Sequence, residues 1–321
     1  MTRKIVLLQP VAPAMEAIIA SLLPEGFTAT AIKGHSPEEV MAGAADADYC
    51  VWWDLPVTAQ VVAAAPRVKL FHKWGVGIDN IDIEACRARG IRIARTTGSN
   101  AVPVAEATVG LMIALARRIV QAHVATVAGG WPKTEVWQRS VLVSGKTVGI
   151  LGLGAIGKGV AQRLRGFDCT ILYHNRNRLP AEEERALGVA YRSLEALLAE
   201  SDILSLNCPL TPETKGLIDA RALARMKRGA LLVNVARGGV VVEADLVAAL
   251  RDGHLAGAAV DVFEQEPPPA DHPLLHMDNV IVTPHTASTA FENSRRSVSH
   301  WLGNILRVSR GEEIPEIDRV L

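Results

Sequence analysis

The sequence lacks the features of a membrane, secreted or nucleic-acid-binding protein. Lys plus Arg and Asp plus Glu number 34 each, so no net charge attracts nucleic acid or an anionic membrane. No stretch approaches the roughly 18 continuous apolar residues of a membrane span. The first apolar run stops after four residues at Gln9 and Pro10, whereas a secretion signal needs about 7–15. We therefore expect a cytoplasmic protein without nucleic-acid or membrane partners.

Cysteine is also scarce, and its spacing fits neither a metal site nor a disulfide framework. Cys50, Cys86, Cys169 and Cys208 lie far apart, and no CxxC pair is present. We interpret them as buried or idle thiols of a reducing compartment, and we expect no metal.

The chain is long enough for two domains of the α/β class. Its 321 residues exceed one ordinary core, and 49% hydrophobic with 21% charged residues is typical of a packed globular protein. Apolar runs alternate with helical segments, and runs this apolar predict strands buried on both faces of parallel sheets. The runs lie at 4–8, 27–32, 48–53, 68–74, 146–151, 169–173, 202–207, 230–235, 255–260 and 279–284. We expect two doubly wound parallel-sheet domains.

A long helical signal over residues 102–124 marks the domain boundary. Asn100 is a suitable N-cap and Pro103 suits the first turn. The segment that follows is rich in turn residues. We place residues 1–99 in the first domain and 100–287 in the second. The last helix, at about 288–310, is expected to pack back on the first domain, which then also includes 288–321.

The glycines of "GLGAIG" predict a dinucleotide-binding turn. Gly152, Gly154 and Gly157 have G-x-G-x-x-G spacing, follow an apolar strand and open a helix. The helix begins at Ala155 and Ile156, and its N–H groups and partial positive charge suit a pyrophosphate.

The next strand ends in "ILYHNRN", without the carboxylate that usually binds the ribose of NAD. Asn175 stands at that position and does not repel a 2′-phosphate. Arg176 follows directly and Arg178 is close, and a guanidinium binds phosphate through charge-assisted hydrogen bonds. We predict that NADP(H) is preferred and that NAD(H) is possible.

Polar residues follow three further strands. Arg237 follows "LLVNVA", Glu266 lies in the loop after "AAVDVF", and His285 follows "VIVTP". Ligands of open α/β sheets bind beyond the carboxyl ends of the strands, so these side chains can converge on one site. An arginine clamp for an anion and a titratable histidine suit proton transfer beside an anionic substrate.

Seven motifs in order resemble the D-isomer-specific 2-hydroxyacid dehydrogenase family, near its glyoxylate and hydroxypyruvate reductases. They are "KWGVGIDNIDIEACRARGI", "NAVPVAEATVGLMIALARR", "GKTVGILGLGAIGK", "CPLTPETKGLI", "NVARGGVV", "DVFEQEPPP" and "TPHTAS". The resemblance implies a Rossmann cofactor domain, a discontinuous flavodoxin-like substrate domain, and a homodimer formed through the cofactor domains.

The resemblance also implies roles for individual residues. Arg237 matches the residue that binds the substrate carboxylate and polarises the carbonyl, His285 the general acid/base, and Glu266 the carboxylate that favours protonated His285. Backbone N–H groups of Val76 and Gly77 match the loop that holds the substrate carboxylate. Lys73 lies beside that loop and is a candidate for an added anion contact. Trp52, Trp53 and Trp74 are candidates for shaping the substrate pocket. Asp261 matches the residue that binds the nicotinamide carboxamide. Further cofactor positions are Thr108, Cys208, Pro209, Thr214, Val235 and Ala236.

The resemblance implies reduction of a small 2-oxoacid, glyoxylate or hydroxypyruvate, to the D-2-hydroxyacid. Alternatives are a 2-ketogluconate-type or D-3-phosphoglycerate dehydrogenase, although the chain is too short for the extra regulatory domain that the latter often carries. Formate dehydrogenases pair their histidine with Gln, unlike Glu266 here. A dinucleotide-sensing corepressor of the same fold remains a hypothesis of another class.

Overall fold

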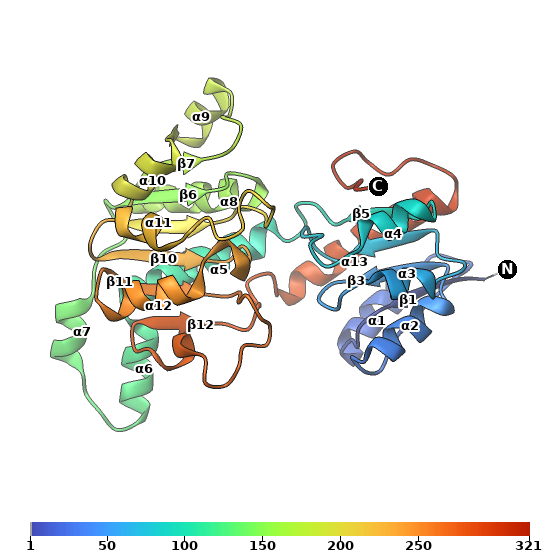
Figure 1. The fold of residues 1–321 in the computed structure, drawn as a ribbon, viewed down its shortest axis with the longest axis horizontal. Helices are drawn as coiled ribbons and strands as arrows, with labels where there is room; N and C mark the ends of the chain where they lie inside the picture. Colours follow the sequence, from blue (N-terminus) through green and yellow to red (C-terminus); the bar gives the residue numbers. More distant parts are fainter. Residues whose placement is uncertain (1) are drawn as a thin grey trace. The chain divides into compact units, whose positions relative to one another are not determined.

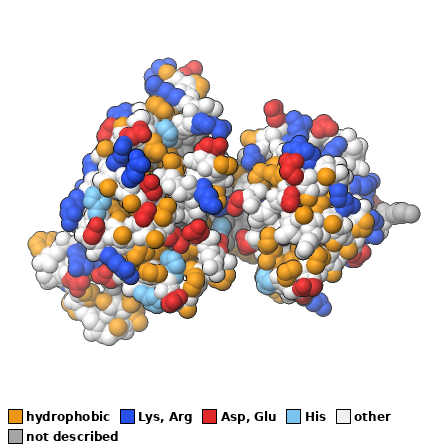
Figure 2. All heavy atoms as spheres, viewed as in Figure 1, with side chains coloured by type: hydrophobic (Ala, Val, Ile, Leu, Met, Phe, Trp, Pro, Cys, Tyr) orange, Lys and Arg blue, Asp and Glu red, His pale blue; other side chains and the backbone are white. Residues whose placement is uncertain are grey.

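The computed structural model describes residues 2–321, which form two compact α/β units (Figure 1). The first unit extends to Asn100 and resumes over Ala290–Leu321, and the second covers Ala101–Thr289. Acidic and basic side chains are interspersed over the face shown in Figure 2. No helix in the described range is long and apolar enough to cross a membrane.

The first unit is built on a five-stranded parallel sheet with the order β2-β1-β3-β4-β5. This is the flavodoxin-like order. Its strands are β1 (Arg3–Leu7), β2 (Phe27–Ala31), β3 (Tyr49–Trp52), β4 (Leu70–Lys73) and β5 (Arg92–Arg95). Its helices are α1 (Pro13–Leu22), α2 (Pro37–Ala45), α3 (Ala59–Ala63), α4 (Ile83–Ala88) and α13 (Ser294–Ser309).

Successive residues of these strands enter two separate cores, one on each face of the sheet. Val6, Cys50 and Phe71 pack on one face, and their neighbours Tyr49 and Leu70 pack on the other. The second face is covered by α1 and α13, the latter inserting the fully buried Trp301. Burial on both faces explains why the strands read as nearly continuous apolar runs.

The second unit contains a seven-stranded parallel sheet with the order β12-β11-β10-β9-β6-β7-β8, the Rossmann arrangement with one strand added. Its strands are β6 (Thr147–Leu151), β7 (Thr170–His174), β8 (Val189–Tyr191), β9 (Ile203–Leu206), β10 (Ala230–Asn234), β11 (Leu255–Val260) and β12 (Val280–Val282). Its helices are α5 (Ala101–Ala116), α6 (Ile119–Val127), α7 (Lys133–Arg139), α8 (Ala155–Leu164), α9 (Ala181–Leu187), α10 (Leu194–Glu200), α11 (Ala220–Arg225) and α12 (Glu243–Arg251). The expected class of two doubly wound parallel-sheet domains is confirmed.

The expected continuous helix over 102–124 is wrong, because the chain breaks between α5 and α6. Arg118 adopts a left-handed backbone conformation with φ of 52°. The N–H of Val141 donates to the carbonyl of Ala116 at 2.8 Å, and the Arg118 guanidinium donates to the carbonyl of Asp278 at 3.2 Å. These contacts from later in the chain stabilise the break. Part of the segment expected to be turns also differs, since Lys133–Arg139 forms α7.

A buried polar network fixes the C-terminal segment of the first unit. The Asp318 carboxylate is 3% exposed, and it accepts hydrogen bonds from His300 at 2.6 Å, Asn304 at 3.1 Å and the N–H of Thr97 at 3.1 Å. The Asn304 amide also donates to His72 at 3.0 Å. Burial alone would raise the pKa of Asp318, but these donors and the charge of His300 hold it below its usual value.

We expect Asp318→Asn to lower the free energy of unfolding by about 1–3 kcal/mol near pH 7. The neutral amide cannot accept all of the hydrogen bonds that the buried carboxylate accepts. A carboxyl with a lowered folded-state pKa stabilises the protein above its unfolded pKa of about 4, and this contribution is lost as pH falls through the folded value. The difference between wild type and variant should therefore shrink on acidification. Urea unfolding at several pH values measures it, with Asp271→Asn at an exposed carboxylate as control. A difference that is constant down to about pH 3 would contradict the assignment.

Candidate active site

The glycine-rich turn after β6 brings three backbone segments into contact. Gly152 has φ of 96°, and a Cβ there would lie 2.6 Å from the nitrogen of Cys208, in the loop after β9. A Cβ on Gly157 would lie 2.3 Å from the carbonyl oxygen of Gly152. Both positions therefore require glycine, the first for its conformation and both for space.

The amino end of α8 is open to an anion. Gly154 is the N-cap and provides no side-chain hydrogen bond, no acidic residue lies in the first turn, and a Cβ on Gly154 would meet nothing within 4 Å. The backbone N–H groups of Ala155, Ile156 and Gly157 thus lie at a helix start without an internal cap. The residues fit a dinucleotide pyrophosphate, which binds such N–H groups.

The end of β7 supports the glycine turn through Asn175. Its side-chain oxygen accepts a hydrogen bond from the N–H of Leu153 at 2.6 Å. Arg176 follows and is exposed. A hydrogen bond from Thr211, a backbone hydrogen bond and the positive charge of Arg176 lower the pKa of Glu213. Arg176 and Glu213 therefore influence each other across the strand ends of β7 and β9.

Arg178, expected to be a second phosphate contact, is paired with Glu184 in this structure. Its Nε and Nη2 atoms both donate to the Glu184 carboxylate at 2.8 Å, and its guanidinium lies 5.4 Å from the centre of the Tyr191 ring. The Tyr173 hydroxyl donates to the same carboxylate at 2.6 Å. Arg178, followed by Tyr173, lowers the pKa of Glu184 to about 2. The guanidinium is committed to holding the start of α9.

Several other positions expected near the cofactor have local structural partners. Thr108 is fully buried, and its hydroxyl donates to the carbonyl of Val104 in its own helix at 2.6 Å. It is therefore not directed at a phosphate. The Thr214 hydroxyl donates to the carbonyl of Pro209 at 2.6 Å and accepts from the N–H of Thr211, which closes the turn after β9. Burial raises the pKa of the Cys208 thiol to about 11.

Arg237 follows β10 in a turn fixed by Asn234. The Asn234 side chain accepts from the N–H of Ala236 at 3.0 Å and donates to the carbonyl of Arg237 at 3.1 Å. Val235 and Ala236 are buried beside it. The next residue, Gly238, packs on the chain after β11, because a Cβ there would lie 1.9 Å from the carbonyl carbon of Phe263. The Arg237 turn and the Glu266 loop are thus in direct backbone contact.

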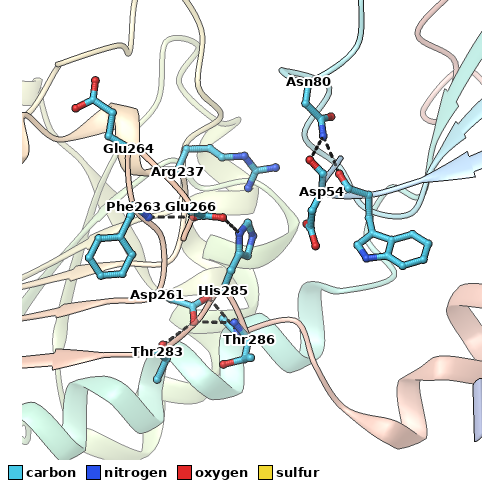
Figure 3. Close-up of polar contacts among 12 residues, drawn as sticks. Asp54, Asn80, Arg237, Asp261, Phe263, Glu264, Glu266, Thr283, His285 and Thr286 are labelled. Carbon is cyan, nitrogen blue, oxygen red and sulfur yellow. Dashed lines mark hydrogen bonds and ion pairs between the residues drawn. The ribbon is translucent and has the colours of Figure 1, made fainter. Parts of the chain in front are cut away.

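Glu266 and His285 form a hydrogen-bonded pair (Figure 3). His285 Nδ1 lies 2.7 Å from Glu266 Oε2, and the other carboxylate oxygen accepts from the N–H of Phe263 at 3.0 Å. Burial would raise the pKa of Glu266, but His285, the Phe263 amide and the charge of Arg237 together lower it. The ionised carboxylate orients the ring, with Nε2 on its opposite side.

The loop that carries His285 is fixed by Asp261, which is 1% exposed. The Asp261 carboxylate accepts from the hydroxyl of Thr283 at 2.5 Å, the N–H of Thr286 at 2.9 Å and the N–H of Ala287 at 3.0 Å (Figure 3). His285 itself has φ of 53° and donates its N–H to the Asp261 carbonyl at 2.8 Å. A left-handed histidine is uncommon and costs energy that this loop must supply.

Two residues not singled out from the sequence support the Glu266 loop. Glu243 accepts from the N–H of Glu264 at 2.7 Å and lies 3.0 Å from His272 Nε2. The Phe263 and His272 rings make an edge contact with centroids 5.5 Å apart. A single carboxylate at the start of α12 gives no sequence signal of this role, since it lies far from Glu264 in the chain. Among the described residues, no cluster of three or more His, Cys, Asp or Glu side chains is placed to hold a metal.

The Val76–Gly77 loop lies at the carboxyl edge of the first unit, after β4. The carbonyl of Gly75 accepts from the N–H of Thr96 at 2.9 Å, and the carbonyl of Lys73 accepts from the Thr96 hydroxyl at 2.9 Å. Lys73 is 6% exposed, and its ammonium donates to the carbonyl of Trp53 and, at 2.8 Å, to Asn80. Lys73, a candidate for an added anion contact, thus also supports the turn of residues 53–55 through these two hydrogen bonds.

The tryptophans expected to shape a substrate pocket form part of the core around this edge. Trp52 is fully buried and donates through Nε1 to Asn80 at 3.0 Å. Trp74 packs against Trp53 and Trp301, with ring centroids 5.3 and 6.0 Å apart. Trp53 and Trp74 are only half-buried, and they are the two with surface at this edge.

Comparisons with known proteins agree with this geometry. Residues 109–287 match the family model described as D-isomer specific 2-hydroxyacid dehydrogenase, NAD binding domain. The chain is 42% identical over 288 residues to a glyoxylate reductase of Thermofilum pendens, covering 88% of this chain and 84% of that protein. A glyoxylate reductase structure from Paecilomyes thermophila has a TM-score of 0.83 at 31% identity, covering 99% and 98%. An NAD-dependent formate dehydrogenase of Staphylococcus aureus in complex with NAD has a TM-score of 0.88 at 30% identity, covering 99% of each chain.

Proposed function

The chain belongs to the D-isomer-specific 2-hydroxyacid dehydrogenases, and from this premise we propose that it reduces glyoxylate or hydroxypyruvate to the D-2-hydroxyacid, with NADPH preferred over NADH. The proposal rests chiefly on the 2.7 Å contact between His285 and Glu266 beside Arg237. The unit that carries α8 binds the cofactor, and the unit that carries the Val76–Gly77 loop binds the substrate carboxylate.

The reaction needs a proton and a stabilised negative charge at the carbonyl oxygen. The nicotinamide cofactor, when bound, supplies the hydride. His285, with Nδ1 held by Glu266, delivers a proton from Nε2 to the oxygen as charge develops there. The Arg237 guanidinium stabilises that charge and the adjacent carboxylate, as a planar fork of donors does. The backbone N–H groups of Val76 and Gly77 hold the substrate carboxylate.

Formate oxidation is the competing chemistry among similar structures. Conversion of formate to carbon dioxide transfers a hydride but no proton to or from an oxygen. A histidine paired with an ionised carboxylate is suited to proton transfer, so the Glu266–His285 pair favours carbonyl reduction. A dinucleotide-sensing binding protein would need neither hydride transfer nor proton transfer. An assay for loss of reduced-nicotinamide absorbance on adding glyoxylate separates these possibilities.

The preference for NADPH rests on the end of β7. The side-chain oxygen of Asn175 accepts a hydrogen bond from the glycine turn, and the next residue is the exposed Arg176. Neither residue is a carboxylate. A ribose 2′-phosphate would therefore meet a guanidinium and no repelling carboxylate at this strand end. The Glu213 carboxylate, after β9, competes with the phosphate for Arg176, because the two charges attract each other.

A homodimer formed through the cofactor-binding units would cover an exposed apolar segment of residues 119–139, the arm. Neither α6 nor α7 contains a buried residue. Trp131 is 81% exposed, Trp137 76% and Val127 74%. Contiguous apolar surface of this kind is rare on monomers and marks interaction sites. We propose that a second copy of the chain covers the arm.

His285→Ala should lower kcat about 10²- to 10⁴-fold, the usual contribution of a general acid, while the Kd of the cofactor changes little. Glu266→Gln should move the pH at which reduction falls off to lower values, because protonated His285 loses the ionised carboxylate that stabilises it. Steady-state kinetics across pH measure both, and His35→Ala, on the loop after β2, serves as control. Near-wild-type turnover by His285→Ala would exclude the mechanism.

Arg176→Ala should raise KM for NADPH about tenfold or more, by loss of a charge-assisted contact, and should change KM for NADH little. The preference for NADPH should also weaken as salt rises. Kinetics with both cofactors provide the measurement. Arg251→Ala, at an exposed arginine at the end of α12, is the matched control. A wild-type enzyme that is equally efficient with NADH would overturn the cofactor assignment alone.

Trp131→Ser combined with Trp137→Ser should halve the mass of the particle in solution, because the exposed indoles are proposed to be buried against the partner copy. Light scattering after size exclusion measures the mass. Phe291→Ser, which removes an exposed aromatic ring from the first unit, should leave the mass unchanged. A monomeric wild-type protein would refute the proposed dimer.

A further inference from the structure

We propose that Asp54 selects the substrate by the side chain attached to the 2-oxoacid group. Its carboxylate accepts a hydrogen bond from a hydroxyl on C3 and repels a second negative charge. Hydroxylated monoanionic 2-oxoacids are thus favoured over dicarboxylic or phosphorylated ones. The inference rests on the proposed function, because it takes the Val76–Gly77 loop as the site of the substrate's own carboxylate.

Asp54 lies at the position of the sheet where a ligand is expected. In the order β2-β1-β3-β4-β5 the chain reverses direction of winding between β1 and β3. Doubly wound sheets bind ligands beyond the carboxyl ends of the strands at such a switch point. Gln9 follows β1, and Asp54 follows β3.

The loop of Asp54 is adjacent to the carboxylate loop. Strands β3 and β4 pair in register up to Trp52 and Lys73, so residues 53–55 and 74–77 leave the sheet side by side. The N–H of Trp74 donates to the carbonyl of Trp52 at 2.7 Å. A side chain on one loop therefore lies near a ligand held by the other, since neighbouring strands are about 4.8 Å apart.

Two amide side chains, the buried Gln9 and the half-buried Asn80, hold the turn of residues 53–55 from opposite sides. The Gln9 side-chain oxygen accepts from the N–H groups of Trp53, Asp54 and Leu55 at 3.2, 2.5 and 3.1 Å. The Asn80 side-chain nitrogen faces the carbonyls of the same three residues at 2.9, 2.9 and 3.3 Å. Figure 3 shows Asn80 beside Asp54. A three-residue turn with every backbone polar group held by a side chain presents Asp54 in one fixed position.

The Asp54 carboxylate is the charge that this turn presents to solvent. The residue is exposed, and Gln9 Nε2 lies 3.5 Å from its Oδ2 atom. Within the described part of the chain, no salt bridge involves Asp54. Lys73, the nearby cation, lies buried beneath the turn with its ammonium on Trp53 and Asn80. A ligand at this edge therefore meets a negative charge first.

Three substrates differ only in the group that Asp54 would meet. Glyoxylate has no C3, hydroxypyruvate carries a C3 hydroxyl, and oxaloacetate carries a second carboxylate. The experiment measures kcat/KM for all three with wild type, Asp54→Ala, Asp54→Asn and the control Glu25→Gln. Glu25 is an exposed carboxylate just before β2, at the amino edge of the same sheet.

Asp54→Ala should lower the ratio of hydroxypyruvate to glyoxylate efficiency about tenfold, by loss of a hydrogen bond to a charged acceptor. Asp54→Asn should raise the ratio of oxaloacetate to glyoxylate efficiency on the order of tenfold, and added salt should reduce this gain. Glu25→Gln should change neither ratio.

Ratios that stay at wild-type values in both Asp54 variants would overturn the inference, as would a wild-type enzyme that reduces oxaloacetate as well as hydroxypyruvate. Either result leaves the proposed function standing if wild type reduces glyoxylate. Failure of wild type to reduce any of the three oxoacids with NADPH or NADH would instead overturn the proposed function.

Discussion

The conformation of the His285 loop depends on the hydrogen bonds of the buried Asp261 carboxylate. This carboxylate accepts a hydroxyl and two backbone N–H groups from Thr283, Thr286 and Ala287, which surround His285. A buried carboxylate without these donors would be costly, and a left-handed histidine without the carboxylate would relax to an ordinary conformation. Each cost is offset by the other group. His285 is thereby held in the position from which Nδ1 lies 2.7 Å from Glu266.

The same device recurs at other strand ends of both sheets. Asn175 supports the glycine turn, Asn234 the Arg237 turn, and Gln9 with Asn80 the turn of Asp54. In each case an amide or carboxyl side chain satisfies backbone groups that leave the sheet and have lost their ladder partners. The loops are therefore rigid without being long. Rigid loops at the carboxyl edges are what a reaction with exacting geometry requires.

The sequence was sufficient to predict the fold class, because strands buried on both faces are visible as apolar runs. It was insufficient for β5 and β8: the segment "RIAR" has an arginine at each end, and the segment "VAY" is only three residues long. The break at Arg118 was also missed, because α5 and α6 have a helical pattern throughout and contacts from Val141 and Asp278 decide the conformation. Tertiary contacts of this kind leave no local signal.

For the candidate site, the residue types at strand ends indicated which side chains to examine. The supporting contacts were not predictable, since Asp261, Asn234 and Glu243 act on residues whose proximity depends on the folded chain. Arg178 is an exception. Its partner Glu184 lies only six residues away in an acidic helix start, and that spacing was a usable signal that the guanidinium is engaged.

The contact between Gly238 and Phe263 joins the Arg237 turn and the Glu266 loop into a single rigid element. With no room for even one carbon atom between the two backbones, neither loop can be lengthened or re-angled alone. Sequence changes that admit larger substrates are therefore not expected in these two loops of the second unit. New specificities should arise by replacement of exposed side chains such as Asp54, in the loop after β3, because such a change leaves the Arg237 turn and the Glu266 loop as they are.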